Sequence, residues 1–273
     1  MIYVTGASGE LGGAVVRSLT ASRVPFLAAT RRPRPGSGYR TCDFDRPETL
    51  DLTGAGTVVM ISAGYAEDDE VVARHEALIS AAERDGVRHI VYTSLVSSGD
   101  LLSIALPHRW TEERLRGSGL TWTILRNGLY AELMARILTP VDGVIGAPLG
   151  NGGVAAVARQ DLAEVTARIA VDPQAHEGRI YDLTGPRTIT AGEIATLLGA
   201  VYRPASLGEL RRGLADLPGL RPFEPERMLS ICAAIACGRL DGVDPALGHL
   251  LGHPARDPLV VVADELAETV RRG

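Results

Sequence analysis

The sequence of 273 residues contains no lysine, so all 28 of its basic residues are arginine. This absence excludes every mechanism that needs a lysine amine, such as Schiff-base formation, a phosphate-binding lysine in a P-loop, and a catalytic Tyr-x-x-x-Lys pair. Cysteine is also scarce. The three cysteines, Cys42, Cys232 and Cys237, are odd in number and lack the spacing of zinc ligands, which is typical of reduced thiols in a cytoplasmic protein.

Long apolar runs and a strong charge of one sign are missing as well. No run approaches the roughly 20 apolar residues of a membrane span, and the chain does not open on a basic-then-apolar leader. The formal net charge of −5 gives no electrostatic reason to expect nucleic acid as a partner. With 45% hydrophobic residues the chain can bury a large core, so we expect a globular cytoplasmic protein that binds neither nucleic acid nor membrane, and no metal.

Short apolar runs alternate with longer helical patterns over the first 130 residues. Strands are expected at residues 1–5, 24–30, 57–62, 89–94 and 120–126. The helices between them are expected at about 10–22, 69–85 and 108–116. Nearly continuous apolar strands that alternate with helices are typical of a parallel sheet covered on both faces. The pattern therefore predicts an α/β fold with a Rossmann-type, doubly wound parallel sheet.

The second half of the sequence is less regular. Short strands at 154–158 and 179–184 and a helix at 161–170 are expected to join the sheet of the first half. Thr190 and Glu193 have the spacing of a helix capping box, and the chain beyond Pro204 is mostly helical. We expect residues 1–130 to form an NADP(H)-binding core, for the reason given next, and residues 131–273 a smaller, mainly helical lobe on the substrate side.

A glycine motif, Gly6-x-x-Gly9-x-x-Gly12, lies between the first expected strand and the first expected helix. Glycines allow the sharp turn and let the backbone approach a pyrophosphate, while the helix N-terminus supplies N–H groups and a partial positive charge. Because the motif has this strand-and-helix context, it predicts dinucleotide binding.

The end of the second strand indicates which dinucleotide is bound. An NAD site places an acidic residue about 20 residues after the glycines, where it holds the ribose 2′-hydroxyl. Here the chain reads Thr30-Arg31-Arg32, and no carboxylate follows until Asp43. A guanidinium matches a 2′-phosphate in charge and geometry, so the sequence favours NADP(H).

Several motifs resemble a known family. They lie at residues 5–12, 75–94, 108–112, 125–130, 159–161, 176–181 and 251–254. In these motifs the chain resembles the NmrA-like atypical short-chain dehydrogenases/reductases. Within that family it resembles the bacterial NADPH-dependent quinone reductases and the triphenylmethane-dye reductases. The resemblance spans nearly the whole chain and is weakest at 33–56 and 204–245.

The resemblance implies a set of NADP(H) contacts. The pyrophosphate would be held by Gly6, Ala7, Ser8, Gly9, Glu10 and Leu11, and the 2′-phosphate by Arg31 with Arg32. Ser62, Ala63 and Gly64 would line the ribose next to the nicotinamide. Asn127, Gly128, Leu129, Tyr130, Ala131 and Glu132 would border the nicotinamide and the substrate, with Val157 behind them. The chain departs from the quinone reductases at Ala63 and Gly64, where hydroxyl residues are usual.

Three residues are candidates for the chemistry: Tyr130, His108 and Asn127. Tyr130 is expected either to border the cleft or to be a packed aromatic, and His108 either to face the substrate or to lie at a helix start. His75 lies among apolar helix residues and is expected to be a hydrogen-bonded structural histidine, while Tyr92, inside an apolar strand, is expected to pack in the core.

The resemblance implies an NADPH-dependent reductase that transfers a hydride to a quinone or a similar small aromatic or carbonyl acceptor. Hydride transfer to a quinone needs little acid–base help from the protein, which agrees with the absence of lysine. Two alternatives stay open: a redox-sensing regulator that binds NADP(H) without turning it over, and a tailoring ketoreductase or epimerase. A homodimer is compatible with all three.

Overall fold

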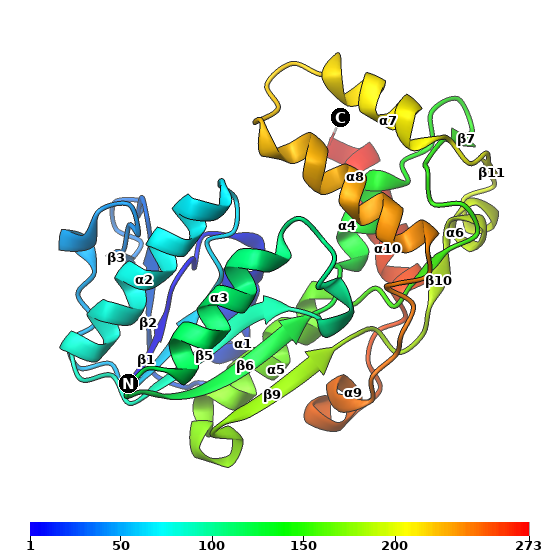
Figure 1. The fold of residues 1–273 in the computed structure, drawn as a ribbon. Helices are drawn as coiled ribbons and strands as arrows, with labels where there is room; N and C mark the ends of the chain where they lie inside the picture. Colours follow the sequence, from blue (N-terminus) through cyan, green and yellow to red (C-terminus); the bar gives the residue numbers. More distant parts are fainter. Residues whose placement is uncertain (273) are drawn as a thin grey trace. The chain divides into compact units, whose positions relative to one another are not determined.

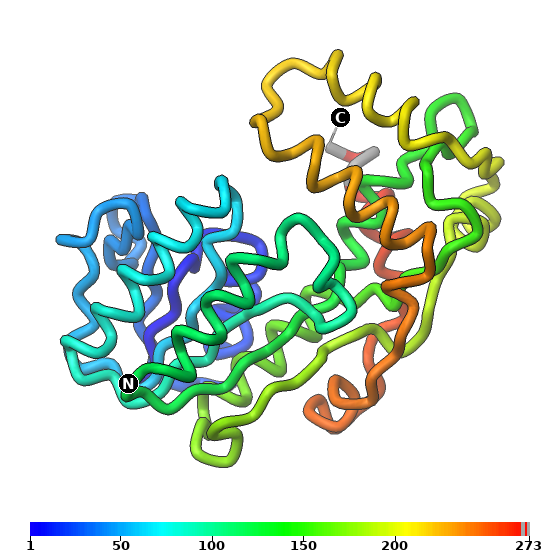
Figure 2. The backbone as a smooth tube through the Cα atoms, in the orientation of Figure 1, coloured from blue at the N-terminus to red at the C-terminus, as the bar shows by residue number. Residues whose placement is uncertain are grey.

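The computed structural model describes residues 1–272 and is drawn as a ribbon in Figure 1 and as a backbone tube in Figure 2. The chain divides into two compact units that alternate along the sequence. The first unit comprises residues 1–95, 106–126 and 159–181, and the second comprises 96–105, 127–158 and the chain from 182 onward.

The first unit is built on a parallel sheet, which in the described residues has seven strands. In spatial order these are β3 (Arg40–Thr41), β2 (Phe26–Thr30), β1 (Ile2–Val4), β4 (Thr57–Met60), β5 (His89–Leu95), β6 (Thr121–Asn127) and β9 (Arg179–Leu183). Strand β1 pairs with both β2 and β4, so that Val4 lies opposite Ala28 and Val59. This order, with a reversal at β1, confirms the predicted doubly wound Rossmann-type sheet.

Four helices cover this sheet: α1 (Glu10–Ala21), α2 (Asp68–Arg84), α3 (Ala105–Arg116) and α5 (Arg159–Val171). Helices α1 and α5 pack side by side on one face, and α2 and α3 lie on the other (Figure 1). The core beneath α2 and α3 includes Leu78, Leu115, Ile90 and Ile124, all fully buried. Burial of this apolar surface is what holds the helices to the sheet.

The strands and helices expected over residues 1–126 and at 161–170 and 179–184 are present with small shifts. The strand expected at 154–158 does not join the parallel sheet, because Gly153–Val154 pairs with Ile189–Thr190 in a separate two-stranded sheet. Helix α3 begins at Ala105, three residues before the predicted start, because Pro107 is tolerated in the first turn of a helix. Strand β3 was not predicted, since its two exposed residues carry no apolar pattern. The short 3-10 helices Pro47–Thr49 and Pro173–His176 complete the unit.

The second unit is mainly helical, as predicted for the C-terminal lobe. Its helices are α4 (Ala131–Ile137), α6 (Ala191–Leu197), α7 (Leu207–Ala215), α8 (Phe223–Ala236), α9 (Ala246–Leu251) and α10 (Pro258–Arg272), with a 3-10 turn at Ser97–Gly99. Its short strand pairs are β8 (Gly153–Val154) with β10 (Ile189–Thr190), and β7 (Val144–Ile145) with β11 (Val201–Tyr202). The predicted capping box is confirmed: Thr190 accepts from the Glu193 N–H, and the Glu193 carboxylate accepts in return.

Within residues 1–272, no helix combines the length and the apolar character needed to cross a membrane. The same residues hold no group of three or more histidine, cysteine or acidic side chains that could bind a metal ion.

Candidate active site

The glycine loop connects β1 to α1 through the sharp turn that the sequence predicts. Gly6 has a φ of +59°, which favours glycine, and its carbonyl accepts from the Gly9 N–H at 2.9 Å. A Cβ on Gly12 would lie 2.2 Å from the Gly6 oxygen, so α1 can start this close to β1 only if glycine stands there. No side chain caps α1 at Gly9. The loop therefore offers a helix N-terminus to an anionic ligand.

Glu10 is the one acidic residue of the predicted pyrophosphate loop, and alone it would repel a phosphate. Its carboxylate instead pairs with the Arg159 guanidinium, Nη2 to Oε2, at 2.8 Å. Arg159 begins α5, which packs along α1. Sequence reasoning did not assign Arg159 to the site, although the residue stands in one of the family-like motifs. The pairing removes the charge conflict between Glu10 and a bound pyrophosphate.

The residues that are predicted to bind the 2′-phosphate follow the end of β2. Ser8 of the glycine loop is tied to it, since the hydroxyls of Ser8 and Thr30 are 2.5 Å apart. Arg31 and Arg32 follow Thr30, and both are exposed, with no hydrogen bond or ion pair in the described part of the chain. The nearest following carboxylate, Asp43, accepts from the Asp45 N–H within its own loop. The Asp45 carboxylate, whose pKa is lowered chiefly by the hydrogen bond from Arg74 and more weakly by the charge of Arg31, is paired with Arg74. The two guanidiniums without a hydrogen bond or ion pair fit a 2′-phosphate.

Side chains hold the loop that follows β4, residues 61–64. The Ile61 N–H donates to Thr5 Oγ1, the Ser62 N–H to Thr93 Oγ1, and the Ala63 N–H to His75 Nε2, each at 3.0 Å. Of the three acceptors, Thr5 directly follows β1, Thr93 lies in β5 and His75 lies in α2. The loop at the carboxyl end of β4 is therefore fixed from three sides, and its contact with the ribose stays a prediction.

His75 is a buried, neutral histidine with a defined tautomer. Because Nε2 accepts the Ala63 N–H, the ring proton is on Nδ1, which lies 2.7 Å from Thr111 Oγ1. Thr111 in turn donates to the Pro107 carbonyl at 2.6 Å. Burial, with smaller contributions from His108 and Arg74, lowers the pKa of His75 to about 3. The prediction of a hydrogen-bonded structural histidine agrees with this geometry.

Tyr92 is fully buried, as predicted, but it also makes a polar contact. Its hydroxyl lies 2.8 Å from Nδ1 of His108, a partly exposed residue of α3. Burial raises the pKa of Tyr92, so the phenol stays protonated near neutral pH. The structure thus places His108 near the start of α3, against a core tyrosine, which agrees with the expected position at a helix start. Its role in the chemistry stays a prediction.

Main-chain bonds hold the segment that follows β6, which belongs to the second unit. The Asn127 carbonyl accepts from the Val96 N–H, and the Gly128 N–H donates to the Leu183 carbonyl, both at 2.9 Å. Val157 lies directly behind the segment, because it donates to the Leu129 carbonyl and accepts from the Ala131 N–H. Tyr130, at the start of α4, is half-buried, and Glu132 is buried.

Asn127 stands apart from the other polar residues of the site. Its side chain is 4% exposed, and neither Nδ2 nor Oδ1 has a hydrogen-bond partner in the described residues. Buried amides are almost always paired in native proteins, so an unpaired one at the carboxyl end of a strand calls for an explanation. A ligand that brings its own donor and acceptor supplies one. Within the first unit, the glycine loop and the arginines fit a bound dinucleotide, and the place of Asn127 beside the cofactor stays a prediction.

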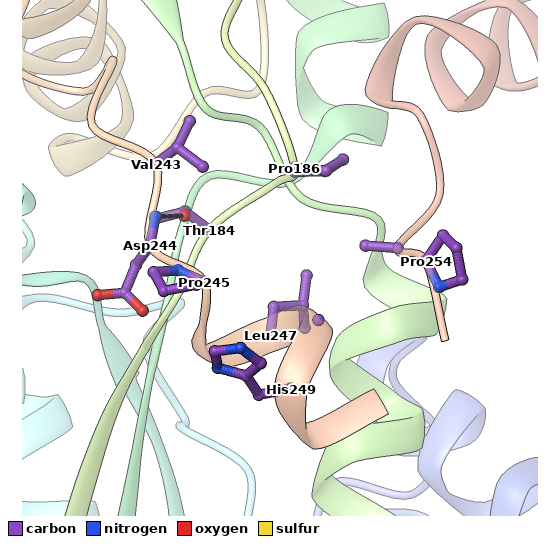
Figure 3. A pocket seen from close by; sticks show the side chains of 10 residues that line it. Thr184, Pro186, Val243, Asp244, Pro245, Leu247, His249 and Pro254 are labelled. Carbon is purple, nitrogen blue, oxygen red and sulfur yellow. Dashed lines mark hydrogen bonds between the residues drawn. The ribbon is translucent and has the colours of Figure 1, made fainter. Parts of the chain in front are cut away.

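A cavity of about 430 Å³ in the second unit contains none of the predicted site residues. Its mostly apolar lining comes from the segment after β9 and from α9 and its flanks, as Figure 3 shows. The polar groups of Asp244 are used locally: its N–H donates to Thr184 Oγ1, and its carboxylate accepts from Ala246. The cavity offers no arrangement of side chains for chemistry.

Together, the sheet order, the glycine loop and the arginine pair define an α/β protein that binds a nicotinamide dinucleotide. A family model described as NAD(P)H-binding matches residues 6–173, and the chain belongs to this NAD(P)H-binding, NmrA-like family. This confirms the resemblance found in the motifs.

The chain is similar to named reductases over nearly its full length. It is 29% identical to quinone oxidoreductase 2 of Escherichia coli K12, covering 93% of this chain and 94% of that protein. It is 27% identical to an NAD(P)H azoreductase of Xenophilus azovorans, covering 94% of each. Among solved structures, the triphenylmethane reductase of Citrobacter sp. complexed with NADP(H) has a TM-score of 0.86 at 27% identity, covering 97% of this chain and 99% of that one.

Proposed function

We propose that this protein is an NADPH-dependent reductase that transfers a hydride to a quinone or a similar small aromatic acceptor. The observation that carries the proposal is the extent of the likeness to quinone and azo reductases, which covers 93% and 94% of the chain and so includes the segments after β4 and β6. The glycine loop, the unpaired arginines and the unpaired Asn127 amide support it independently of any name.

In the proposed reaction the main task of the protein is to orient the cofactor and the acceptor relative to each other. When bound, NADPH supplies a hydride, which together with one proton converts a quinone to a hydroquinone. The residues of this chain would hold the two reactants in line, Ser62 to Gly64 on the ribose side and Asn127 to Glu132 on the nicotinamide side. Because a hydroquinone anion is itself stable, water can provide the proton, and His108 and Tyr130 would assist without being indispensable.

The preference for NADPH over NADH is proposed to rest on Arg31, with Arg32 beside it. Arg31→Ala should weaken NADPH binding by about 10- to 150-fold, the worth of a charge-assisted contact, and leave NADH binding nearly unchanged. Arg34→Ala is the matched control, since Arg34 is also exposed but does not directly follow Thr30, the last residue of β2. Calorimetric titration of each variant with NADPH and with NADH measures the affinities. Equal weakening of NADPH and NADH binding by Arg31→Ala would contradict the assignment of Arg31 to the 2′-phosphate.

The activity itself is tested by the oxidation of NADPH with a simple benzoquinone. We expect turnover with NADPH and much less with NADH at equal concentrations. Tight NADPH binding without turnover of benzoquinones, naphthoquinones or azo dyes would contradict the proposed reaction while leaving the cofactor site intact.

A further inference from the structure

Tyr65 is the one exposed aromatic side chain among the described residues. Of the chain's twelve Phe, Trp and Tyr residues, the others are buried or half-buried, whereas Tyr65 is 60% exposed. A single exposed apolar side chain is ordinary in itself. Tyr65 differs by its place in the fold, because it directly follows the loop 61–64 that Thr5, Thr93 and His75 hold in position.

The loop that leads to Tyr65 borders the crevice in which an open parallel sheet binds its ligands. Such a crevice lies beyond the carboxyl ends of the strands, at the point where the strand order reverses. Here the order reverses at β1, so the crevice lies between the loop after β1 and the loop after β4. The two loops are in contact, since a Cβ added to Gly6 would lie 3.3 Å from Cβ of Ile61. Tyr65 therefore lies on the β4 side of the crevice, four residues beyond that contact.

The adenosine half of a dinucleotide belongs on the other side of β1. The arginines that fit the 2′-phosphate, Arg31 and Arg32, follow β2, and β1 separates β2 from β4. At the usual spacing of neighbouring strands, the ends of β2 and β4 are about 10 Å apart. An exposed ring on the β4 side is therefore accessible to a second ligand, and a flat aromatic ligand offers it a matching face.

Carboxylates are concentrated next to this ring. The run at residues 67–70, which reads Glu-Asp-Asp-Glu, spans the N-cap position and the first turn of α2. The first basic residue of the helix, Arg74, is bonded to the Asp45 carboxylate and lies 3.9 Å from that of Glu70. Residues 67–74 thus carry four carboxylates and one guanidinium, so their field disfavours an anionic ligand.

We propose that Tyr65 is the stacking face for the acceptor and that the carboxylates at 67–70 make this face select neutral or cationic rings over anionic ones. The inference rests on the proposed reduction of aromatic acceptors and adds the residues that decide which acceptor is taken. The tyrosine ring supplies affinity through contact with a flat ligand. The carboxylates act over several ångströms without contact, and they supply the discrimination by charge.

The first test separates the ring of Tyr65 from its hydroxyl. Tyr65→Leu removes the ring, and Tyr65→Phe keeps it and is the matched control. With saturating NADPH, Tyr65→Leu should raise the KM for 1,4-naphthoquinone about 3- to 10-fold and change kcat by less than about twofold, whereas Tyr65→Phe should stay within about twofold of the wild type. The NADPH affinity of both variants, measured by calorimetry, should stay within about twofold. Tyr65→Met gives the same comparison if the leucine variant does not fold.

Binding of the acceptor can also be measured without turnover. Protein loaded with NADP⁺ holds no hydride to donate, so calorimetric titration with 1,4-naphthoquinone reports binding alone. Tyr65→Leu should weaken this binding by the same factor of about 3 to 10, and Tyr65→Phe should not.

The second test concerns the charge beside the ring. The double variant Glu67→Gln/Asp69→Asn should lower the KM for 1,4-naphthoquinone-2-sulfonate about three- to fivefold at low salt and leave that for 1,4-naphthoquinone within about twofold. Asp172→Asn/Glu177→Gln is the matched control, because it removes two exposed carboxylates that flank the 3-10 helix before β9. Salt at about 0.5 M should also lower the KM of the wild type for the sulfonate, since it screens the carboxylates.

Three results would overturn the inference: an unchanged naphthoquinone KM in Tyr65→Leu, a loss of NADPH affinity as large as the loss for the quinone, or an unchanged sulfonate KM in the double variant. Quinone turnover with an unaltered KM in Tyr65→Leu would keep the proposed reaction and lose the Tyr65 assignment. A protein whose naphthoquinone binding depends on Tyr65 but which oxidises no NADPH would keep that assignment and lose the reaction.

Discussion

The loop that follows β4 lies in the first unit and the segment that follows β6 in the second, and the two are held in opposite ways. Side chains fix the loop after β4: Thr5, Thr93 and His75 each accept one of its N–H groups. Main-chain groups fix the loop after β6, through Val96 and Leu183. In the first loop the side chains serve the fold, whereas in the second loop the Asn127 side-chain amide takes no part in holding the segment and has no hydrogen-bond partner in the described residues.

This difference shows which positions can change independently. A loop held by side chains depends on residues that are distant in sequence and, in the case of His75, on a protonation state. A loop held by its backbone tolerates side-chain replacement but needs space close to the chain, as at Gly128. The following predictions test this contrast.

The largest effect is expected at His75. His75→Ala removes the acceptor for the Ala63 N–H and leaves a buried cavity, which together should lower the free energy of unfolding by about 3–5 kcal/mol. His75→Gln can still accept from Ala63 and should cost less. Urea unfolding at neutral pH measures both. Equal losses in the two variants would mean that volume, and not the hydrogen bond to the loop, is what matters.

The same residue should make stability fall in acid. Burial lowers the pKa of His75 to about 3 and that of His89 to about 4. Between these values and the usual histidine pKa of about 6.5, the unfolded chain binds protons that the folded chain does not. Stability is therefore highest above about pH 6.5 and is lost as the pH falls, by up to about 1.4 kcal/mol per pH unit for each histidine.

The control for this pH effect is His75→Gln. Its unfolding free energy should depend less steeply on pH, by about the share of one histidine. Unfolding curves between about pH 7 and pH 5 give the two slopes. Identical slopes in variant and wild type would show that His75 does not titrate with unfolding.

The smallest effect is expected at Gly128, in the loop held by its backbone. A Cβ there would lie 3.2 Å from the Leu183 oxygen, so Gly128→Ala should destabilise the protein by about 1 kcal/mol. At Gly146 an added Cβ would meet only open space, and Gly146→Ala should stabilise by about 0.4–1 kcal/mol through the unfolded state. Thermal unfolding separates the two, and effects of the same sign would contradict the contrast between the loops.

Local patterns predicted much of this structure. The glycine loop, the strand that ends at Thr30 and the capping box at Thr190 each depend on residues a few positions apart, so the sequence contains them directly. The parallel sheet follows from apolar strands that alternate with helices. The positions of residues 62–64 and 127–132 beside the cofactor came from the family resemblance and stay predictions.

What the sequence could not predict depends on contacts between distant residues. The pairing of Glu10 with Arg159 requires α1 and α5 to be neighbours, which no local pattern states. The contact of Tyr92 with His108 was missed because an apolar strand predicts packing alone. The two-residue strands β3, β7 and β11 are too short to show a period.

The packing of α5 along α1 also makes the support of the glycine loop depend on residues that are synthesised much later than the loop. The glycine loop is complete once the first dozen residues have emerged, yet Arg159 and the helix that supports α1 are made much later. A nascent chain that stops before α5 carries the whole motif but exposes the apolar face of α1. A chain that stops before α5 thus keeps the entire glycine motif but lacks both the Arg159 partner of Glu10 and the helix that packs along α1.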